Sequence, residues 1–491
     1  MALGAVAAMP WASAAEFSAA APAQLAAAVK KSHPGDTIIL ADGTWRDAAI
    51  DLAVGGTSSA PLVLRAQTPG GVVFTGASSL TFSAAHVEVD GVVFKDGSPA
   101  KGNVVEFDSD DCRLTNSAVV DFNPVDPAKG YYWVYFHGNR NRVDHCLFQG
   151  KNHYEPLVGN NINGSRYNTV EFSHFKDIAY VNQNGREIFR VWGYGGNEEL
   201  GPDGAFFTIA NNLFEHAHGE GQEIISLKSN RNVVRNNTIR GTRGGITNRS
   251  GNYNTIEGNF IFGDGQAGTY GLRITGQYHR ILHNYIEGVS GFGINVMCGE
   301  LFLEPLTDGF KPILREGTVH GRVPAYNQPR NTTVAYNTIV NCGGPGLVIG
   351  SDYRSGWPAR QRVLLPEFCH IANNLIGQSA GGVAVSITAP DRKPPLDRLE
   401  FAGNTYDGNL VNGGAIKAEP VPAGIVAQEL KFVRDAAGAL RPADAALAQS
   451  SAAAAPAVFS KEASPFRPLT AADVGPDWVK ARRAAGDPAF R

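Results

Sequence analysis

The chain is organised as a long series of short apolar segments separated by turns rich in Gly, Asn and Asp. From about residue 80, each segment carries the same motif: an apolar residue, a polar residue, Asn, a small or apolar residue, and another apolar residue. The motif is centred on Asn116, His145, Ser173, Asn212, Asn237, Asn259, Asn284, Asn337, Asn374 and Asn404. The closest centres are 22 residues apart, and longer separations indicate the same unit with an insertion. This pattern is typical of a solenoid.

The segments are short strands, and the repeat leaves no room for a crossover helix. We therefore predict an all-β fold, a parallel β-helix in which successive coils stack and apolar side chains fill the interior. The preferred hand of parallel connections predicts a right-handed coil. The recurring Asn is expected to form a side-chain ladder at a corner, where Asn tolerates left-handed backbone. A β-propeller needs about 40 residues per blade and a hairpin pattern that this chain lacks, and a sandwich is the other rival.

The two ends of the chain depart from the repeat. Residues 1–15 are apolar and Ala-rich, end in Ala12-Ser13-Ala14, and contain no Lys or Arg, as in a signal-peptide remnant. We therefore predict a periplasmic or secreted protein, with no segment long enough to span a membrane. The run AAPAQLAAAVKKSHPG predicts an N-terminal helical cap before strands. Residues 16–410 are predicted to form the β-helix catalytic domain, and residues 411–491 the terminal coils and a C-terminal cap.

Composition supports this picture and limits the function. The chain has 57 Gly but only 3 Met and 18% charged residues, which favours a turn-dense β protein over helical bundles. Its net charge of −3 gives no general attraction to polyanions, so an acidic ligand requires a local basic patch, and nucleic acid binding has no compositional support. The five Cys fit neither a disulfide framework nor metal-ligand spacing, so we expect buried, free thiols.

Two long insertions are expected to leave the coil as loops. They contain VWGYGGNEELGPDG, between Ser173 and Asn212, and MCGELFLEPLTDGFKP, between Asn284 and Asn337. Loops of this kind would wall a groove on one face of the solenoid.

Three cations recur at nearly the same phase of consecutive coils. Lys228, Arg249 and Arg273 lie 9, 10 and 11 residues before the Asn centre of their own coil. Neighbouring coils are about 4.8 Å apart, so these cations are expected to stack. Like charges this close require a compensating anion, which indicates a polyanionic ligand. The alternatives are three splayed side chains on a solvated face, or a column that binds sugar acids without reacting with them.

Several segments resemble one enzyme family. PGDTIILADGTW, APLVLRAQTPGGVVFTG, EIISLKS, NRSGNYNTIEGNF, GLRITGQYHRILHNYIEG and LTAADVGPDW are similar to polysaccharide lyase family 6, which contains alginate lyases and chondroitinase B. The resemblance covers roughly residues 16–480. It implies cleavage of an acidic polysaccharide by β-elimination.

The resemblance also implies roles for individual residues. Lys228 matches the base that removes the C5 proton of the uronate, and Arg249 matches the acid that acts on the leaving glycosidic oxygen. Arg273 and His279 match positions that hold the sugar near the cut. We also place Tyr278 at the substrate, and it is a candidate proton donor together with Tyr270 and His283.

A calcium ion held by one Asn and two Glu is implied as well. Asn184, Glu220 and Glu223 are the matching residues. The family pattern has one residue between the two Glu, whereas this chain has Gly221 and Gln222. Either the extra residue forms a bulge that returns Glu220 to the ion, or one acidic ligand is lost.

The chemistry suits these residue types, but several functions remain open. A cation on a uronate carboxylate stabilises the enolate-like state formed when the neighbouring proton leaves, and nearby positive charge makes a lysine a better base. We expect alginate as the substrate, with chondroitin or dermatan sulfate as the alternative. A non-catalytic glycan-binding β-helix, a C5-epimerase and a glycoside hydrolase are further alternatives, although a hydrolase requires two carboxylates about 5 to 9 Å apart across the sugar.

Overall fold

A computed structural model of the chain describes residues 14–162, 164–182, 184–193, 203–303, 312–313, 326–354, 360–379, 381–390, 400–450 and 466–490. Most of the predicted signal-peptide remnant and the centres of both predicted groove-walling loops lie outside these residues. Export therefore stays a prediction. Among the described residues, no helix is long and apolar enough to cross a membrane.

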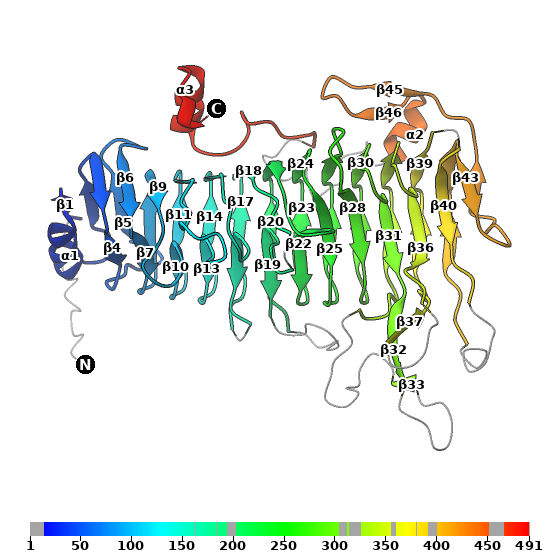
Figure 1. The fold of residues 1–491 in the computed structure, drawn as a ribbon, viewed down its shortest axis with the longest axis horizontal. Coiled ribbons are helices and arrows are strands. Elements are labelled where there is room, and N and C mark those ends of the chain that lie inside the picture. Colours follow the sequence, from blue (N-terminus) through cyan, green and yellow to red (C-terminus); the bar gives the residue numbers. More distant parts are fainter. Residues whose placement is uncertain are drawn as a thin grey trace, which may run out of the picture.

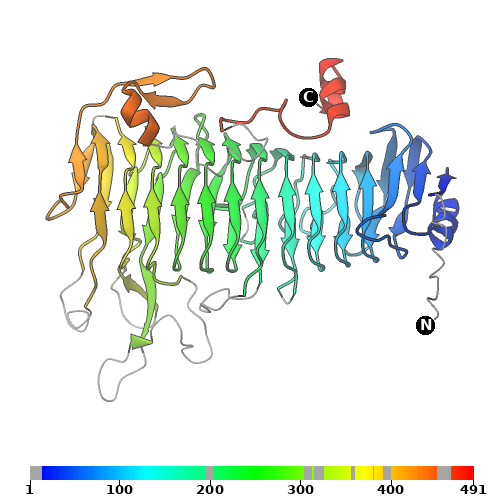
Figure 2. The same ribbon diagram turned by 180° about the vertical axis from the view of Figure 1, so that it is seen from behind.

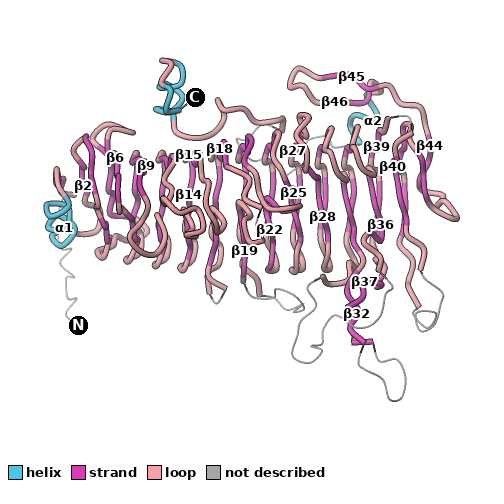
Figure 3. Tube along the Cα trace, in the orientation of Figure 1, coloured by secondary structure: helices cyan, strands magenta, loops and turns pink. Residues whose placement is uncertain are grey.

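The described residues form the predicted parallel β-helix, an elongated stack of coils (Figure 1). A regular coil contributes one strand to each of three long parallel sheets, so most strands pair with the strand three places along the chain. Figure 3 shows how few helices accompany these strands.

Sheet A contains β1 (Glu16–Ala19), β2 (Thr37–Leu40), β5 (Leu62–Ala66), β8 (Val87–Asp90), β11 (Arg113–Thr115), β14 (Arg142–Asp144), β17 (Thr169–Glu171), β20 (Thr208–Ala210), β23 (Val233–Arg235), β26 (Thr255–Glu257), β29 (Arg280–Leu282), β34 (Thr333–Ala335), β38 (His370–Ala372) and β41 (Thr405–Asp407).

Sheet B contains β3 (Gly43–Arg46), β6 (Val72–Gly76), β9 (Val92–Gly97), β12 (Ala118–Val120), β15 (Leu147–Gln149), β18 (His174–Ile178), β21 (Leu213–Ala217), β24 (Thr238–Arg240), β27 (Phe260–Phe262), β30 (Tyr285–Glu287), β35 (Thr338–Val340), β39 (Leu375–Gly377), β42 (Asn409–Asn412) and β44 (Ile425–Ala427).

Sheet C contains β4 (Ala49–Asp51), β7 (Ser79–Phe82), β10 (Val105–Phe107), β13 (Val134–Phe136), β16 (Val158–Asn160), β19 (Phe189–Trp192), β22 (Glu223–Lys228), β25 (Gly244–Asn248), β28 (Thr269–Ile274), β31 (Ile294–Met297), β36 (Leu347–Ser351), β40 (Val383–Ile387) and β43 (Ala415–Lys417).

The interior is apolar and built from side chains that stack from coil to coil. Phe82, Phe107 and Phe136 occupy paired positions of sheet C, with successive ring centroids 4.5 and 4.8 Å apart. These separations match the spacing of the coils, so the register of the strands fixes the packing of the core. All five Cys are buried and free, as predicted.

The predicted Asn ladder lies at the corner between sheets A and B. Each member accepts a hydrogen bond from the backbone N–H of the preceding member, as at Asn237 and Asn259, where the N–H···O distance is 3.0 Å. The ladder residues are Ser173, Asn212, Asn237, Asn259, Asn284, Asn337, Asn374 and Asn409. Asn116 and His145 lie one residue before this position and have left-handed backbone, with φ of 51° and 52°.

A second ladder lies at the corner between sheets C and A and was not predicted. Backbone N–H groups of one coil donate to side chains of the next at Asn141, Asn168, Asn232, Asn254, His279, Thr332 and Asn404. Asn404 therefore belongs to this second ladder and not to the first. The two ladders satisfy backbone donors where the chain turns and cannot pair as a strand.

The ends of the solenoid are covered differently. The helix α1 (Pro22–Lys31) packs on the first coil, as predicted for the N-terminal cap. At the other end the coils continue to β44, followed by a hairpin of β45 (Phe432–Arg434) and β46 (Leu440–Pro442) and by α2 (Ala445–Ser450). The chain then runs back along the outside of the solenoid, so that α3 (Asp477–Ala484) and the 3-10 helix η3 (Pro488–Phe490) lie near the N-terminal coils (Figure 2).

This returning arm covers apolar side chains on the outer face of sheet B. Val479 and Phe490 pack with Val93, Ala118 and Leu147, and Leu469 packs with Leu213. The Trp478 indole N–H donates to the backbone carbonyl of Asn116 at 2.8 Å.

An inserted sheet flanks sheet C toward its C-terminal end, beside β31 and β36. It consists of β32 (Gly299–Leu303), β33 (Pro312–Ile313) and β37 (Arg360–Leu364), paired antiparallel in the order β33-β32-β37. In Figure 1 these strands project from one edge of the solenoid. They provide one wall beside the outer face of sheet C.

Candidate active site

The candidate catalytic residues lie on the outer face of sheet C, where β22 and β25 are adjacent. In β22, Ile225 and Leu227 are fully buried in the core, and Ser226 and Lys228, which alternate with them, lie on the outer side. The pairing of Leu227 with Asn248 places Lys228 beside Arg249 on the next coil. This adjacency, predicted from the repeat, brings the proposed base and the proposed acid together.

Arg273 is offset from the column in which it was predicted. It pairs with Thr247, and Thr247 pairs with Ser226, so Arg273 lies two residues before the register of Lys228 and Arg249. Counting from the Asn centres does not give the register, because the turn after Arg249 is one residue longer than the turn after Lys228. Because the offset is two residues, Arg273 remains on the outer face.

Lys228 makes an ion pair with a carboxylate that was not predicted to belong to the site. Its Nζ lies 3.0 Å from Oε1 of Glu187 and 4.7 Å from the centroid of the Trp192 ring. Glu187 is fully buried and also accepts hydrogen bonds from Arg190 at 2.9 and 3.0 Å. Burial raises the pKa of Glu187, but the charges of Lys228 and Arg190 outweigh burial and hold that pKa below its usual value. Glu187 is therefore ionised.

The extra residue between Glu220 and Glu223 forms a tight turn. Glu220 and Glu223 exchange backbone hydrogen bonds, and Gly221 between them has φ of +39°. The turn returns Glu220 to the cluster, where its carboxylate accepts hydrogen bonds from the backbone N–H groups of Gly185 and Arg186, the latter at 2.9 Å. Burial and the negative charge of Glu187 raise the pKa of Glu220 above its usual value.

Glu223, the third carboxylate of the cluster, contacts both Arg249 and Arg273. It makes an ion pair with Arg273, and its Oε1 lies 3.6 Å from Nε of Arg249. Its other oxygen accepts a hydrogen bond from the Ser226 hydroxyl at 2.5 Å. One buried carboxylate thus contacts both arginines on the outer side of sheet C.

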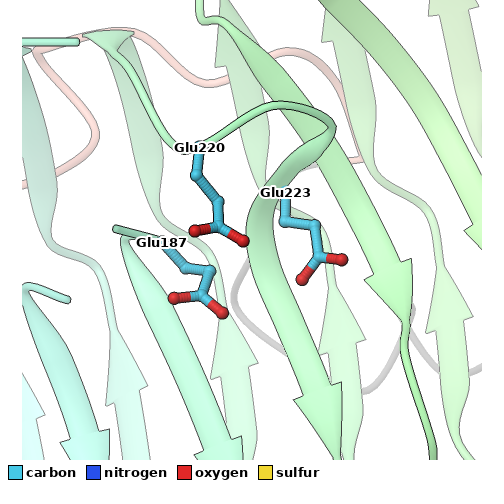
Figure 4. A group of neighbouring side chains, drawn as sticks. All are labelled: Glu187, Glu220 and Glu223. Carbon is cyan, nitrogen blue, oxygen red and sulfur yellow. The ribbon is translucent and has the colours of Figure 1, made fainter. Parts of the chain in front are cut away.

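Glu187, Glu220 and Glu223 each offer a carboxylate oxygen within 4.8 Å of the others (Figure 4). Three hard oxygen ligands at this separation suit Ca²⁺, which accepts carboxylates in flexible geometry. Glu187 was not among the predicted ligands. Asn184 is exposed, its backbone carbonyl accepts a hydrogen bond from the Tyr154 hydroxyl, and its role as a ligand stays a prediction. The sequence contains a signal for Glu187: REIFRVW aligns with QEIISLK on the next coil, so Glu187 occupies the phase of Glu223.

His279 lies in the interior and not at the substrate face. Its side chain is 1% exposed, its Nδ1 accepts the backbone N–H of Asn254 at 3.1 Å, and its Nε2 lies 2.9 Å from the carbonyl of Thr275. Burial lowers the pKa of His279 to about 4, so the ring is neutral. These contacts make His279 a member of the second ladder, which corrects its prediction as a substrate-binding residue.

The candidate proton donors are spread over two corners. Tyr278 is 40% exposed and stacks on Tyr253 of the preceding coil, with ring centroids 4.9 Å apart, at the corner between sheets C and A. His283 stacks on Tyr336 at the far end of β29, at the corner between sheets A and B. Tyr270 lies in β28 of sheet C and packs on Phe292. His283 is therefore the candidate that does not belong to sheet C or its corner with sheet A.

The chain is similar to one protein-family model and to several solved structures. The family model for Chondroitinase B matches residues 19–418. A PL6 family polysaccharide lyase of Pseudopedobacter saltans has a TM-score of 0.80 and 43% sequence identity, covering 94% of this chain and 99% of that chain. The PL6 family alginate lyase AlyGC has a TM-score of 0.77 and 26% identity, covering 94% of this chain and 58% of that chain.

A mannuronic acid specific family 6 lyase from human gut microbiota has a TM-score of 0.71. Its identity is 24%, over 96% of this chain and 98% of that chain, and this similarity supports the fold alone. No curated protein matches the sequence.

Proposed function

Because the chain belongs to polysaccharide lyase family 6, we propose that it depolymerises alginate by β-elimination. Membership makes the chain a polysaccharide lyase. The choice of alginate, the roles of individual residues and the involvement of calcium are the proposal.

The observation that carries the proposal is a series of cations on consecutive coils. Arg190 in β19, Lys228 in β22, Arg249 after β25 and Arg273 in β28 each face the outer side of sheet C. A polymer with a carboxylate on every sugar suits a face with a cation on each of four consecutive coils. Dermatan sulfate carries carboxylates at alternate sugars and sulfate groups on the sugars between them, so the substrate panel below has to decide between the two polymers.

Lys228 is the proposed base. The proton on C5 of a uronate is weakly acidic, since its removal places negative charge beside a carboxylate, and positive charge at that carboxylate stabilises the resulting state. Lys228 is 16% exposed at its side chain, which gives it access to a sugar on the outer face. Arg273, which lies two residues from Lys228 in register, would bind the uronate carboxylate.

Arg249 is the proposed group at the leaving glycosidic oxygen. Its side chain is 25% exposed and lies beside Lys228 on the next coil. A guanidinium remains protonated at neutral pH, so its contribution is mainly electrostatic, and a neighbouring hydroxyl or water delivers the proton. Elimination on this geometry leaves an unsaturated uronate at the new chain end.

We also propose that Glu187, Glu220 and Glu223 hold a calcium ion. The ion would supply positive charge next to the substrate carboxylate. The three carboxylates lie among Arg190, Lys228, Arg249 and Arg273, so the protein already balances much of their charge.

The proposal is tested with a substrate panel. The protein is incubated with alginate, with its mannuronate-rich and guluronate-rich blocks, and with dermatan sulfate, and ultraviolet absorbance of the unsaturated product is followed. We expect a rise on alginate or its blocks. A rise on dermatan sulfate alone would overturn the choice of polymer, and saturated product with inverted uronate would indicate an epimerase.

A further inference from the structure

Tyr326, on the segment that leads from the inserted sheet back to the coils, lies against Arg249. The Arg249 guanidinium carbon is 4.0 Å from the centroid of the Tyr326 ring. The Arg362 guanidinium, in β37, is also 4.0 Å from that centroid, and Arg273 is 5.8 Å away. Two guanidinium groups at 4.0 Å cannot share one face of a ring without overlapping, so Arg249 and Arg362 take opposite faces.

The inserted sheet holds Tyr326 on the side away from Arg249. The backbone N–H of Glu300, in β32, donates to the carbonyl of Tyr326 at 2.8 Å. Glu300 pairs with Arg362 in the antiparallel register, and its buried carboxylate lies 3.6 Å from the Arg362 Nε. Arg362 also makes an ion pair with Asp352. The charge of Arg362 is thereby neutralised, and this arginine serves as a support for the ring.

Tyr326 also limits where the Arg249 guanidinium can lie. Arg249 has a carboxylate, Glu223, 3.6 Å from its Nε, and a stronger ion pair with Glu223 would draw the guanidinium away from the outer face. The aromatic face holds the cation by cation–π attraction without withdrawing it into an ion pair. Tyr326 therefore connects the inserted sheet to Arg249, the proposed acid.

We propose that Tyr326 is a positioning residue that holds Arg249 in its reactive place, and that the inserted sheet acts on the reaction through this ring and Arg362. This inference rests on the proposed role of Arg249 in β-elimination. The ring, and not the phenolic hydroxyl, carries the function. The inserted sheet is in this respect part of the active site and not only a wall.

The test compares Tyr326→Phe, Tyr326→Leu and Arg362→Gln on the polymer that gives the largest ultraviolet signal. We expect Tyr326→Phe to keep kcat within about threefold, because the ring is retained. Tyr326→Leu should lower kcat on the order of 30- to 100-fold with KM changed by less than about threefold, as a small displacement of a reacting group does. Arg362→Gln should lie between them.

A crystal structure of Tyr326→Leu makes the test independent of the substrate. We expect the Arg249 guanidinium to move toward Glu223 while the coils stay unchanged. Unchanged kcat in Tyr326→Leu, or an unmoved Arg249, would overturn the inference. Equal losses in Tyr326→Phe and Tyr326→Leu would instead assign the function to the hydroxyl. If the wild-type protein yields no product on any polymer, the lyase proposal fails, and the position of Arg249 in the two crystal structures still decides this one.

Discussion

The Nζ of Lys228 lies 3.0 Å from Oε1 of Glu187, a fully buried and ionised carboxylate on the preceding coil. An amine held in an ion pair with a carboxylate is not free to take a proton from the substrate, as a base must. Release of Glu187 from this ion pair is therefore a condition for the proposed reaction. Glu187 is also one of the three carboxylates that suit Ca²⁺, so ion binding and the ion pair compete for the same residue.

This competition predicts a linkage between Lys228 and calcium. We expect Lys228→Ala to bind Ca²⁺ about tenfold more tightly than the wild-type protein, because the ion no longer displaces an ammonium. Glu220→Gln should bind at least tenfold more weakly. Isothermal titration calorimetry without substrate measures both. Glu106→Gln, an acidic residue of sheet C in β10, is the control and should leave the affinity unchanged. Equal affinities in all four proteins would contradict the assignment of the ion to these carboxylates.

The neutral, buried His279 predicts a pH dependence of stability. Its pKa is about 4 in the folded chain and about 6.5 when unfolded, so the unfolded chain binds the proton first as the pH falls. With respect to His279, the free energy of unfolding should be at its maximum above about pH 6.5. It should fall by about 3 kcal/mol as the pH approaches 4.

The variant His279→Asn isolates this effect. Asn occupies the equivalent ladder position at Asn254 and can accept the same backbone hydrogen bond. Urea unfolding at pH 7 and pH 4.5 should show a smaller loss in the variant than in the wild type, and activity at pH 7 should stay within a few-fold. A large loss of activity with unchanged stability would restore His279 as a substrate-binding residue.

The buried Asn ladder predicts a large cost for losing one member. Asn259 accepts from the backbone N–H of Asn237, and its amide donates to the carbonyl of Val234 at 3.0 Å and to Asn284 at 2.9 Å. Asn259→Ala leaves buried donors and acceptors without partners, so we expect the free energy of unfolding to fall by about 3 kcal/mol. The exposed Asn152→Ala should change it by less than about 0.5 kcal/mol. Similar effects in urea unfolding would contradict the role of the ladder.

The coil architecture could be predicted from sequence because each coil repeats one local pattern. Apolar alternation defines the strands, and the Asn phase from Asn212 to Asn374 marks one corner correctly. The second ladder uses Asn, His and Thr in turn, so its members share hydrogen-bonding capacity but no single residue type. The arm ending in α3 packs far from its neighbours in the sequence, and no local pattern specifies such a contact.

The part of the site that was predicted lies on one strand and on its repeat in the next coil. Lys228 and Arg249 could be placed together because they lie at the ends of paired strands of consecutive coils. The offset of Arg273 could not be told from residue counts, because Lys228 and Arg249 share a register although their counts differ by one. Tyr326 and Arg362 enter from an insertion outside the repeat, and only the folded chain brings them to Arg249.

The most direct test of the central claim compares the wild-type protein with Lys228→Ala on alginate. Ultraviolet absorbance measures unsaturated product, and fluorescence titration with alginate oligomers measures binding. We predict product from the wild type, a loss of about 10³-fold in kcat for Lys228→Ala, and a Kd within a few-fold of the wild type. Product formed by the variant at the wild-type rate, or no product from the wild type on any polymer of the panel, would contradict the account.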